Sequence, residues 1–158
     1  MKTLLIYDSF FGNTEQIAQA VGKVLGLSNQ VEICRVSDVK PEQLTGLKLL
    51  IVGSPTRGFR PTLAIVDLLK GISANALQGV KVAAFDTRIA TSDIKSAVLR
   101  VMVNFGGYAA APIAAQLKKK GGEVLAPPEG FFVQDREGPL KPGELERAAK
   151  WAAQLSLE

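Results

Sequence analysis

Short apolar runs alternate with longer amphipathic segments along almost the whole chain, and this alternation is what most restricts the fold. Apolar or alternating runs predict strands at residues 3–8, 30–36, 47–53 and 80–87. Apolar residues at helical spacing predict helices at residues 14–25, 62–72, 92–105, 109–120 and 143–157. A fifth strand position, residues 123–134, is broken by Pro127-Pro128-Glu129-Gly130, so we expect two short pieces on one line.

Strands that alternate with helices are typical of an α/β fold, a doubly wound five-stranded parallel sheet with helices on both faces. The pattern by itself fits either a Rossmann-type strand order or the order 2-1-3-4-5. The length of 158 residues suits a single domain, and we interpret residues 1–158 as one domain.

The composition excludes several kinds of catalytic and structural site. The chain has no histidine and one cysteine, Cys34, so a histidine base, a disulfide framework and a thiolate zinc site are all excluded. Cys34 lies in an apolar-polar run and is interpreted as a buried strand residue. Any redox chemistry would therefore need a cofactor.

The net charge is +4, but the only dense basic cluster is Lys118-Lys119-Lys120, ahead of two glycines. Basic residues are common at the C-terminal end of a helix, where they interact favourably with the helix dipole. This cluster is therefore interpreted as a solvated helix end, and we expect no nucleic-acid partner. The apolar run at the N-terminus stops at Asp8, and no stretch is long enough to cross a bilayer, so we expect no membrane span and a cytoplasmic location.

In a doubly wound sheet, ligands bind beyond the carboxyl ends of the strands. Three loops at that edge carry unusual residues. Ser9-Phe10-Phe11-Gly12-Asn13-Thr14 offers hydroxyls, an amide and a glycine at a helix start, which are the groups that a phosphate needs. The loop over residues 53–61 is long and contains Phe59 and two arginines, Arg57 and Arg60. The third runs from Asp86 to Ser92, where Ser92 could cap the next helix.

Residues 5–15, with the loop Ser9-Phe10-Phe11-Gly12-Asn13-Thr14 at their centre, resemble the phosphate-loop signature of flavodoxins. Gly53-Ser54-Pro55-Thr56-Arg57-Gly58 is similar to the flavin loop after strand three of that family, and Phe85-Asp86-Thr87-Arg88 stands at the place of its second flavin loop. The resemblance covers essentially the whole chain. It implies flavin mononucleotide (FMN), the strand order 2-1-3-4-5, and one- or two-electron transfer.

Carried over by position, the resemblance implies that Ser9, Phe10, Phe11, Gly12, Asn13 and Thr14 hold the phosphate. It places Ser54, Pro55, Thr56, Arg57, Gly58 and Phe59 on one side of the isoalloxazine ring and Asp86, Thr87, Arg88 and Ile89 on the other. No catalytic residue and no metal ligand is implied.

The sequence departs from the family pattern in three ways. Phe11 stands where many relatives have threonine, the loop after strand four lacks a tyrosine or tryptophan, and the chain is basic where carrier flavodoxins are usually acidic. Phe59 is then the best stacking aromatic. Positive charge from Arg57, Arg60 and Arg88 would stabilise the anionic hydroquinone, so we expect a high semiquinone/hydroquinone potential. Gly58 could turn its peptide carbonyl toward the reduced flavin.

The leading hypothesis is an FMN-binding electron-transfer protein that cycles between oxidised, semiquinone and hydroquinone flavin, with a redox protein or a small electron acceptor as its partner. Two alternatives share the fold: an FMN-dependent reductase of a quinone or another small acceptor, and a binding module that has lost the cofactor. Whether the protein is an enzyme, and its oligomeric state, stay open. Receiver, dehydrogenase, nucleotide triphosphatase and serine-hydrolase functions lack their required motifs.

Overall fold

The apolar runs form a parallel sheet in the computed structural model, which describes residues 2–98 and 107–156. Its strands are β1 (Lys2–Tyr7), β2 (Gln30–Arg35), β3 (Leu49–Pro55), β4 (Lys81–Ile89), β5 (Glu123–Val124) and β6 (Glu129–Val133). The order is β2-β1-β3-β4-β5, and β6 also pairs with β4. Thus β5 and β6 share the fifth position on either side of the proline break, and the predicted order 2-1-3-4-5 is confirmed.

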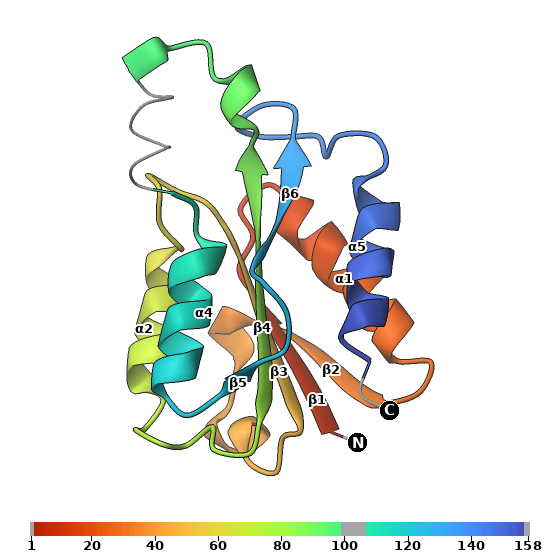
Figure 1. Cartoon of the computed structure of the whole chain (residues 1–158), viewed down its shortest axis with the longest axis vertical. Coiled ribbons are helices and arrows are strands. Elements are labelled where there is room, and N and C mark those ends of the chain that lie inside the picture. Colours follow the sequence, from red (N-terminus) through yellow and green to blue (C-terminus); the bar gives the residue numbers. More distant parts are fainter. Residues whose placement is uncertain (1, 99–106, 157–158) are drawn as a thin grey trace.

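Two pairs of helices cover the sheet, one pair on each face (Figure 1). Helices α2 (Leu63–Gly71) and α4 (Ala110–Lys119) lie on one face, and α1 (Asn13–Leu25) and α5 (Glu144–Gln154) lie on the other. Between β2 and β3 the chain forms only two short 3-10 helices, Val36–Asp38 and Pro41–Leu44. None of the helices in the described ranges is both long and apolar enough to cross a membrane.

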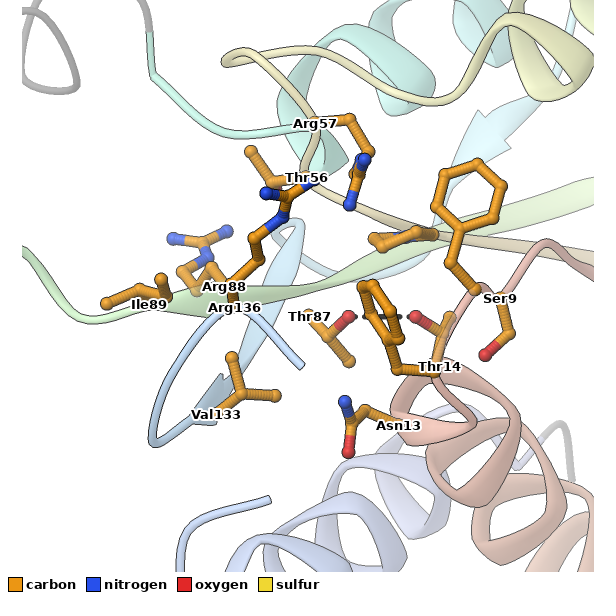
Figure 2. Close-up of a pocket in the computed structure, with 13 residues that line it drawn as sticks. Ser9, Asn13, Thr14, Thr56, Arg57, Thr87, Arg88, Ile89, Val133 and Arg136 are labelled. Carbon is orange, nitrogen blue, oxygen red and sulfur yellow. Dashed lines mark hydrogen bonds between the residues drawn. The ribbon is translucent and has the colours of Figure 1, made fainter. Parts of the chain in front are cut away.

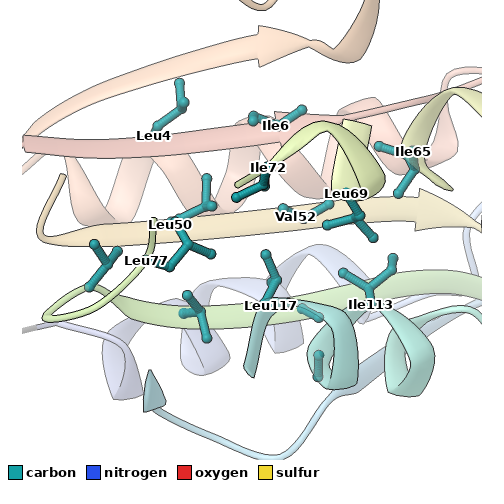
Figure 3. Packing of buried hydrophobic residues seen from close by; sticks show 14 of the residues in the cluster. Leu4, Ile6, Leu50, Val52, Ile65, Leu69, Ile72, Leu77, Ile113 and Leu117 are labelled. Carbon is teal, nitrogen blue, oxygen red and sulfur yellow. The ribbon is translucent and has the colours of Figure 1, made fainter. Parts of the chain in front are cut away.

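Alternate residues of each strand enter two separate apolar cores. Leu4 and Ile6 of β1 join Leu50 and Val52 of β3 under α2 and α4 (Figure 3). Leu5 and Tyr7 point to the opposite face, as the pleat of a strand requires. Burial on both faces explains why these strands are apolar without interruption.

The α1/α5 side of the core contains three aromatic rings in mutual edge contact. Phe85 lies 6.1 Å from Phe131 and 5.9 Å from Trp151, measured between ring centroids. Trp151 is buried, so the interpretation that it packs against the core is confirmed. Edge-to-face aromatic pairs add about 0.5–1.5 kcal/mol each beyond the area that they bury.

Two expected elements differ from the structure. The strand expected to end at residue 87 continues to Ile89, because Arg88 and Ile89 pair with Phe132 and Val133 of β6. The helix expected at residues 92–105 is wrong at its start, where Thr91–Asp93 form a 3-10 helix and Ile94 is extended. Ser92 lies inside this 3-10 helix and caps no α-helix, and Asp93 forms an ion pair with Lys141, which precedes α5. Residues 99–106 of that expected helix lie outside the described residues.

Candidate functional site at the carboxyl edge of the sheet

A small pocket of about 90 Å³ lies where the carboxyl ends of β1, β3 and β4 meet (Figure 2). We call it the edge pocket. It is lined by three groups of residues, one from each loop singled out in the sequence, together with two residues from the segment that follows β6. The lining residues are Ser9, Phe10, Phe11, Asn13 and Thr14; Pro55, Thr56 and Arg57; Thr87, Arg88 and Ile89; and Val133 and Arg136.

The N-terminus of α1 supplies backbone donors at the edge pocket. Gly12 is the N-cap residue, with a φ of 89° that favours glycine, and it offers no side-chain cap to the helix. Its own N–H donates to Ser9 Oγ at 3.1 Å, which shapes the loop. The N–H groups of the first turn therefore keep their capacity to bind an anion, assisted by the helix dipole.

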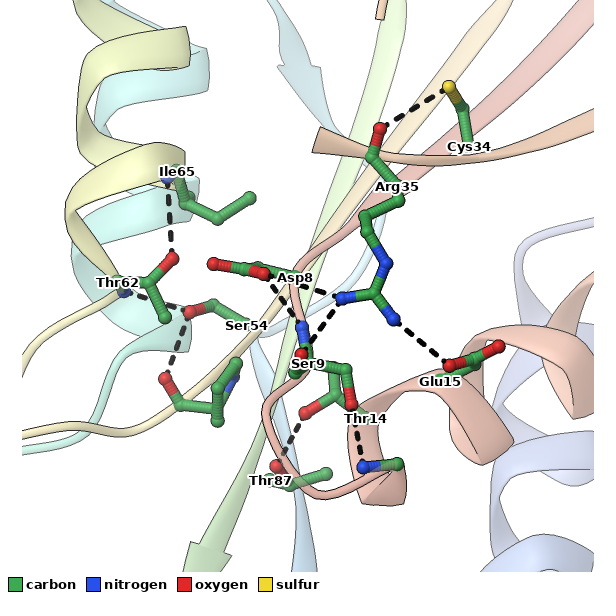
Figure 4. Close-up of polar contacts among 12 residues, drawn as sticks. Asp8, Ser9, Thr14, Glu15, Cys34, Arg35, Ser54, Thr62, Ile65 and Thr87 are labelled. Carbon is green, nitrogen blue, oxygen red and sulfur yellow. Dashed lines mark hydrogen bonds and ion pairs between the residues drawn. The ribbon is translucent and has the colours of Figure 1, made fainter. Parts of the chain in front are cut away.

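Two threonine hydroxyls meet between α1 and β4. Thr14 Oγ1 lies 2.8 Å from Thr87 Oγ1, and both side chains are buried (Figures 2 and 4). Thr14 belongs to the first turn of α1, as the sequence indicated, while Thr87 belongs to β4. Asn13 lies beside them and donates through Nδ2 to the Glu137 carbonyl at 3.2 Å. A hydroxyl pair of this kind can donate to and accept from a bound oxyanion.

Arg57, Arg88 and Arg136 give the edge pocket a positive charge, and none of the described residues that line it is a carboxylate. The Arg57 guanidinium lies 4.8 Å from the ring centroid of Phe10 and 6.0 Å from that of Phe11. Both phenylalanines are exposed, so this stacked cation and its two rings form the outer wall of the pocket.

Arg88 differs from Arg57 because its charge is already paired. It donates from Nε and Nη2 to the two oxygens of Asp86, each at 2.6 Å, and Asp86 also accepts from the Ala110 N–H at 2.9 Å. Burial raises the pKa of Asp86, and the hydrogen bonds from Arg88 oppose that rise. Asp86 is fully buried and does not line the edge pocket, so its role in the structure is to hold Arg88 and the start of α4.

Tyr108 completes this arrangement from beyond the end of β4. Its ring centroid lies 3.9 Å from the Arg88 guanidinium, and its hydroxyl donates to the Ile89 carbonyl at 3.2 Å. The same hydroxyl lies 2.8 Å from that of Thr91. Tyr108 thereby connects the end of β4, the segment after it and the start of α4.

The loop after β3 closes on itself. Ser54, which is buried, accepts the Thr62 N–H at 3.1 Å and donates to the Pro55 carbonyl at 2.9 Å, so it fixes the base of the loop and lies outside the edge pocket (Figure 4). At the tip, Arg57 and Arg60 exchange backbone hydrogen bonds of 2.8 and 3.0 Å. Gly58 and Phe59 form the turn between them, with φ values of 54° and 67°.

Phe59 lines a second, larger depression of about 460 Å³, which we call the Phe59 hollow. Ile89 lines both the Phe59 hollow and the edge pocket, so the two adjoin at that residue. Asp93, Ile94 and Lys95 contribute from the segment after β4, and Gln134 and Asp135 from the segment after β6. Most of the residues expected to bind the cofactor line the edge pocket. The five that do not are Gly12, Ser54, Gly58, Phe59 and Asp86.

Arg35 of β2 fixes the loop between β1 and α1 from the other side (Figure 4). It donates to the Ser9 carbonyl at 2.8 Å and to Glu15 at 3.1 Å, and its Nη1 lies 3.8 Å from Asp8 Oδ1. The two acidic groups nearest the loop are therefore paired with Arg35, which leaves the edge pocket with its positive charge.

Three residues near the site were not predicted from the sequence: Tyr108, Val133 and Arg136. Val133 and Arg136 reach the edge pocket because β6 runs beside β4 and ends at the same edge of the sheet. The proline break at residues 127–130 was a usable signal, since it implied that the second piece of the fifth strand ends near the loops. In the described ranges, no cluster of three or more His, Cys, Asp or Glu residues could hold a metal ion.

Solved structures resemble this chain over its whole length. A flavodoxin from the domain Archaea superimposes with a TM-score of 0.78 at 22% sequence identity, over 99% of this chain and 96% of the other. The chain has the flavodoxin fold. Flavodoxin 1 from Bacillus cereus gives a TM-score of 0.76 at 17% identity, over 98% of this chain and 96% of that one.

The same flavodoxin fold occurs as one part of a larger protein. Rubredoxin oxygen:oxidoreductase from Desulfovibrio gigas matches 99% of this chain with a TM-score of 0.71 and 18% identity, but only 37% of its own length is covered. No family model matches the sequence, and neither does any curated protein. The likeness is therefore one of fold.

Proposed function

We propose that this protein binds FMN and acts as an electron-transfer protein of the flavodoxin type. One observation carries the proposal: the uncapped N-terminus of α1 opens on a pocket with the Thr14 and Thr87 hydroxyls, three arginines and no carboxylate among its described lining residues. Backbone N–H groups, hydroxyls and guanidinium groups are the usual partners of a phosphate. The flavodoxin fold of the chain supports the same assignment.

The sizes of the two depressions suit the two ends of FMN. The edge pocket, at about 90 Å³, has room for a phosphate but not for a ring system. The Phe59 hollow adjoins it at Ile89 and, at about 460 Å³, falls within the usual range for ligand sites. The phosphate would lie against the start of α1, and the ring would extend over Ile89 toward Phe59.

Bound FMN would supply the one- or two-electron chemistry, because the side chains of this chain offer little of their own. There is no histidine, and burial raises the pKa of the Cys34 thiol. The protein's part is to hold the phosphate, orient the ring and set its electrostatic environment. We propose a cytoplasmic protein whose partner is a redox protein or a small electron acceptor.

The charges near the proposed ring position are not equivalent. Asp86 pairs with Arg88, whereas Arg57 and Arg60 have no ion pair with any carboxylate in the described part of the chain. Arg57 lines the edge pocket, whereas Arg60 lines neither the edge pocket nor the Phe59 hollow, so Arg57 would make the larger contribution to stabilising a reduced, anionic flavin. Asp93 and Asp135, which line the Phe59 hollow, would oppose it.

The decisive experiment compares FMN with riboflavin, which has the same ring but no phosphate. Purified protein is titrated with each compound, and flavin absorbance and fluorescence quenching are recorded. We expect FMN to bind at least about 100-fold more tightly, since charge-assisted hydrogen bonds to a phosphate contribute about 1.5–3 kcal/mol each. Equal affinity for the two compounds would show that the edge pocket does not bind the phosphate. Absence of any bound flavin would leave the flavodoxin fold as a cofactor-free binding module.

A reductase of a quinone or another small acceptor is the second candidate, and the Phe59 hollow is the observation that favours it. Its lining combines apolar Phe59, Ile89 and Ile94 with the polar and charged side chains of Asp93, Lys95, Gln134 and Asp135. A planar acceptor could enter such a depression beside the ring. Turnover of a benzoquinone with NADPH by the FMN-loaded protein would favour the reductase, and its absence would favour the carrier.

A further inference from the structure

A groove separate from the edge pocket runs between α2 and α4. We call it the α2–α4 groove. It has a volume of about 490 Å³, and Pro61, Val66, Leu69 and Pro112 are its apolar lining residues. Pro61 precedes α2, Val66 and Leu69 belong to α2, and Pro112 belongs to the first turn of α4, so the groove lies between the two helices.

The remaining lining residues of the groove are almost all cations. Arg60, Lys70, Lys119 and Lys120 line it together with Gln116, and no carboxylate is among its described lining residues. None of the four cations has an ion pair with a described carboxylate. The groove is therefore an apolar depression surrounded by positive charge that the described residues leave uncompensated.

The groove continues beyond Pro61 into a shallower depression. Arg60 and Pro61 line both, and Leu63 and Phe10 line the second. Leu63 is 80% exposed and Phe10 is 55% exposed. The one carboxylate in the second depression, Asp8, is paired with Arg35. A surface with exposed apolar anchors and arginines has the composition of a protein interface.

The combined surface borders the proposed flavin site. Arg60 belongs to the same tight turn as Phe59, and Arg57 lines both the edge pocket and the second depression. A protein seated in the groove would thus have its edge close to the turn formed by Gly58 and Phe59.

We propose that the α2–α4 groove and the adjoining depression are the docking surface for an acidic protein partner. Uncompensated cations would attract a carboxylate-rich surface and orient it, and the apolar lining would receive an apolar side chain of that partner. Docking itself does not require the cofactor. That the docked protein exchanges electrons rests on the proposed function.

The test uses a plant-type [2Fe–2S] ferredoxin as a probe of a small, acidic redox protein. The ¹⁵N-labelled chain, with and without added FMN, is titrated with the probe while amide signals are followed by NMR. We expect shifts at Arg60, Val66, Lys70 and Gln116, and weaker binding as salt rises from about 50 to about 300 mM, because salt screens exposed charges.

Two variants with the same net charge separate local docking from general attraction. K70E/K119E should weaken binding of the probe at least about tenfold, whereas K23E/K150E, on α1 and α5, should change it less than about threefold. Both pairs remove two exposed lysines, and circular dichroism checks that each variant folds. An equal loss in both variants would reduce the effect to net charge and overturn the proposal.

Q116W tests the groove without changing any charge, because an indole at this exposed position of α4 would fill the depression. We expect Q116W to weaken binding of the probe. Unchanged binding would show that the probe does not dock in the α2–α4 groove. Tighter binding of a single-stranded oligonucleotide than of the ferredoxin would also overturn the proposal. If FMN fails to bind but the probe still docks, the proposed function fails and the docking surface stands.

Discussion

The hydroxyl oxygens of Thr14 and Thr87 lie 2.8 Å apart and join the first turn of α1 to the last third of β4. Both side chains are buried, at 1% and 5% exposure, and each hydroxyl has the other as its hydrogen-bond partner. This contact fixes the distance between the two elements that bear the edge pocket. It also leaves unused hydrogen-bonding capacity on both hydroxyls for a ligand.

Replacing either threonine by valine should leave the hydroxyl of the other threonine without its hydrogen-bond partner. We expect T14V and T87V each to lower the free energy of unfolding by about 1–2 kcal/mol, the usual cost of an unsatisfied buried polar group. The double variant T14V/T87V should lose less than the sum, since neither stranded hydroxyl remains. Urea unfolding of the four proteins measures this, and strictly additive losses would show that the two hydroxyls are not coupled.

Removing the cation from the Asp86–Arg88 pair should be more damaging. R88M leaves the fully buried Asp86 carboxylate with only the Ala110 N–H among its present partners, and an uncompensated buried charge costs about 3–5 kcal/mol. The pKa of Asp86 would then rise further, so the folded state would bind a proton more tightly than the unfolded state. The stability of R88M should therefore fall as pH rises above about 4, the unfolded value.

The double variant D86N/R88M is the control for this pair. It removes the stranded charge, so we expect it to recover part of the lost stability and to lose the pH dependence of R88M. Urea unfolding at pH 5 and pH 8 distinguishes the two variants. Equal stability of R88M at both values would mean that Asp86 is already ionised at pH 5 in the folded variant, and that its pKa is not raised as expected.

The fold was predictable because the pattern of apolar and polar residues indicates most of its strands and helices. Strands buried on both faces are apolar throughout, which predicts a parallel sheet covered by helices on both faces. The pairing of β1 with β3 was implied by the family resemblance and not by this pattern. The element that failed, at residues 92–96, has helical spacing of apolar residues, but Ile94 lines the Phe59 hollow with Phe59 and Ile89. Tertiary contacts thus determined the backbone there, and a local periodicity does not contain them.

The candidate site was predictable only as a set of loops. Glycine, serine and threonine at strand ends indicated where a phosphate could bind, but sequence could not distinguish residues that line a pocket from those that hold a loop together. Ser54 and Asp86 are of the second kind, since both are buried and satisfied by partners in the fold. Tyr108 was missed because its partner, Arg88, is distant in sequence.

Acid should weaken the connection between β6 and α5. Burial alone would raise the pKa of Glu144, but hydrogen bonds from Arg147 and from the Phe132 N–H outweigh it and lower that pKa below its ordinary value. A lowered folded pKa means that this stabilisation is present above the unfolded value, about 4.3, and is lost as pH falls through the folded value.

E144Q provides the comparison for this acid dependence. We expect it to cost about 1–2 kcal/mol at pH 7, after allowing for the partial exposure of Arg147, and to lose less stability than the parent between pH 5 and pH 3. Thermal unfolding across this range measures the difference. Parallel curves for the two proteins would assign the acid response to other groups.

Two glycines should respond in opposite ways to a methyl group. A Cβ at Gly58 or at Gly71 would have no atom within 4 Å, so packing contributes to neither change. Gly58 has a φ of 54°, and G58A should therefore cost about 1–2 kcal/mol of stability through backbone strain. Gly71 ends α2, and G71A should stabilise the protein by about 0.5–1 kcal/mol. Chemical unfolding gives both values, and the same sign for both would contradict the turn geometry.

The charge of Arg57 should be measurable in the reduction potential of bound FMN. Arg57 lines the edge pocket and lies beside two phenyl rings without an ion pair to a described carboxylate, so its field acts on a ligand with little local compensation. R57Q should lower the potential of the step that forms the anionic flavin by about 40 mV, equivalent to roughly 1 kcal/mol of charge interaction.

K23Q, which removes an equal charge from α1, is the control and should shift the potential by less than about 10 mV because salt screens it. Spectroelectrochemical titration of the FMN-loaded proteins gives both potentials. If R57Q and K23Q shift the potential equally, the flavin responds to net charge and not to the arginine beside the edge pocket.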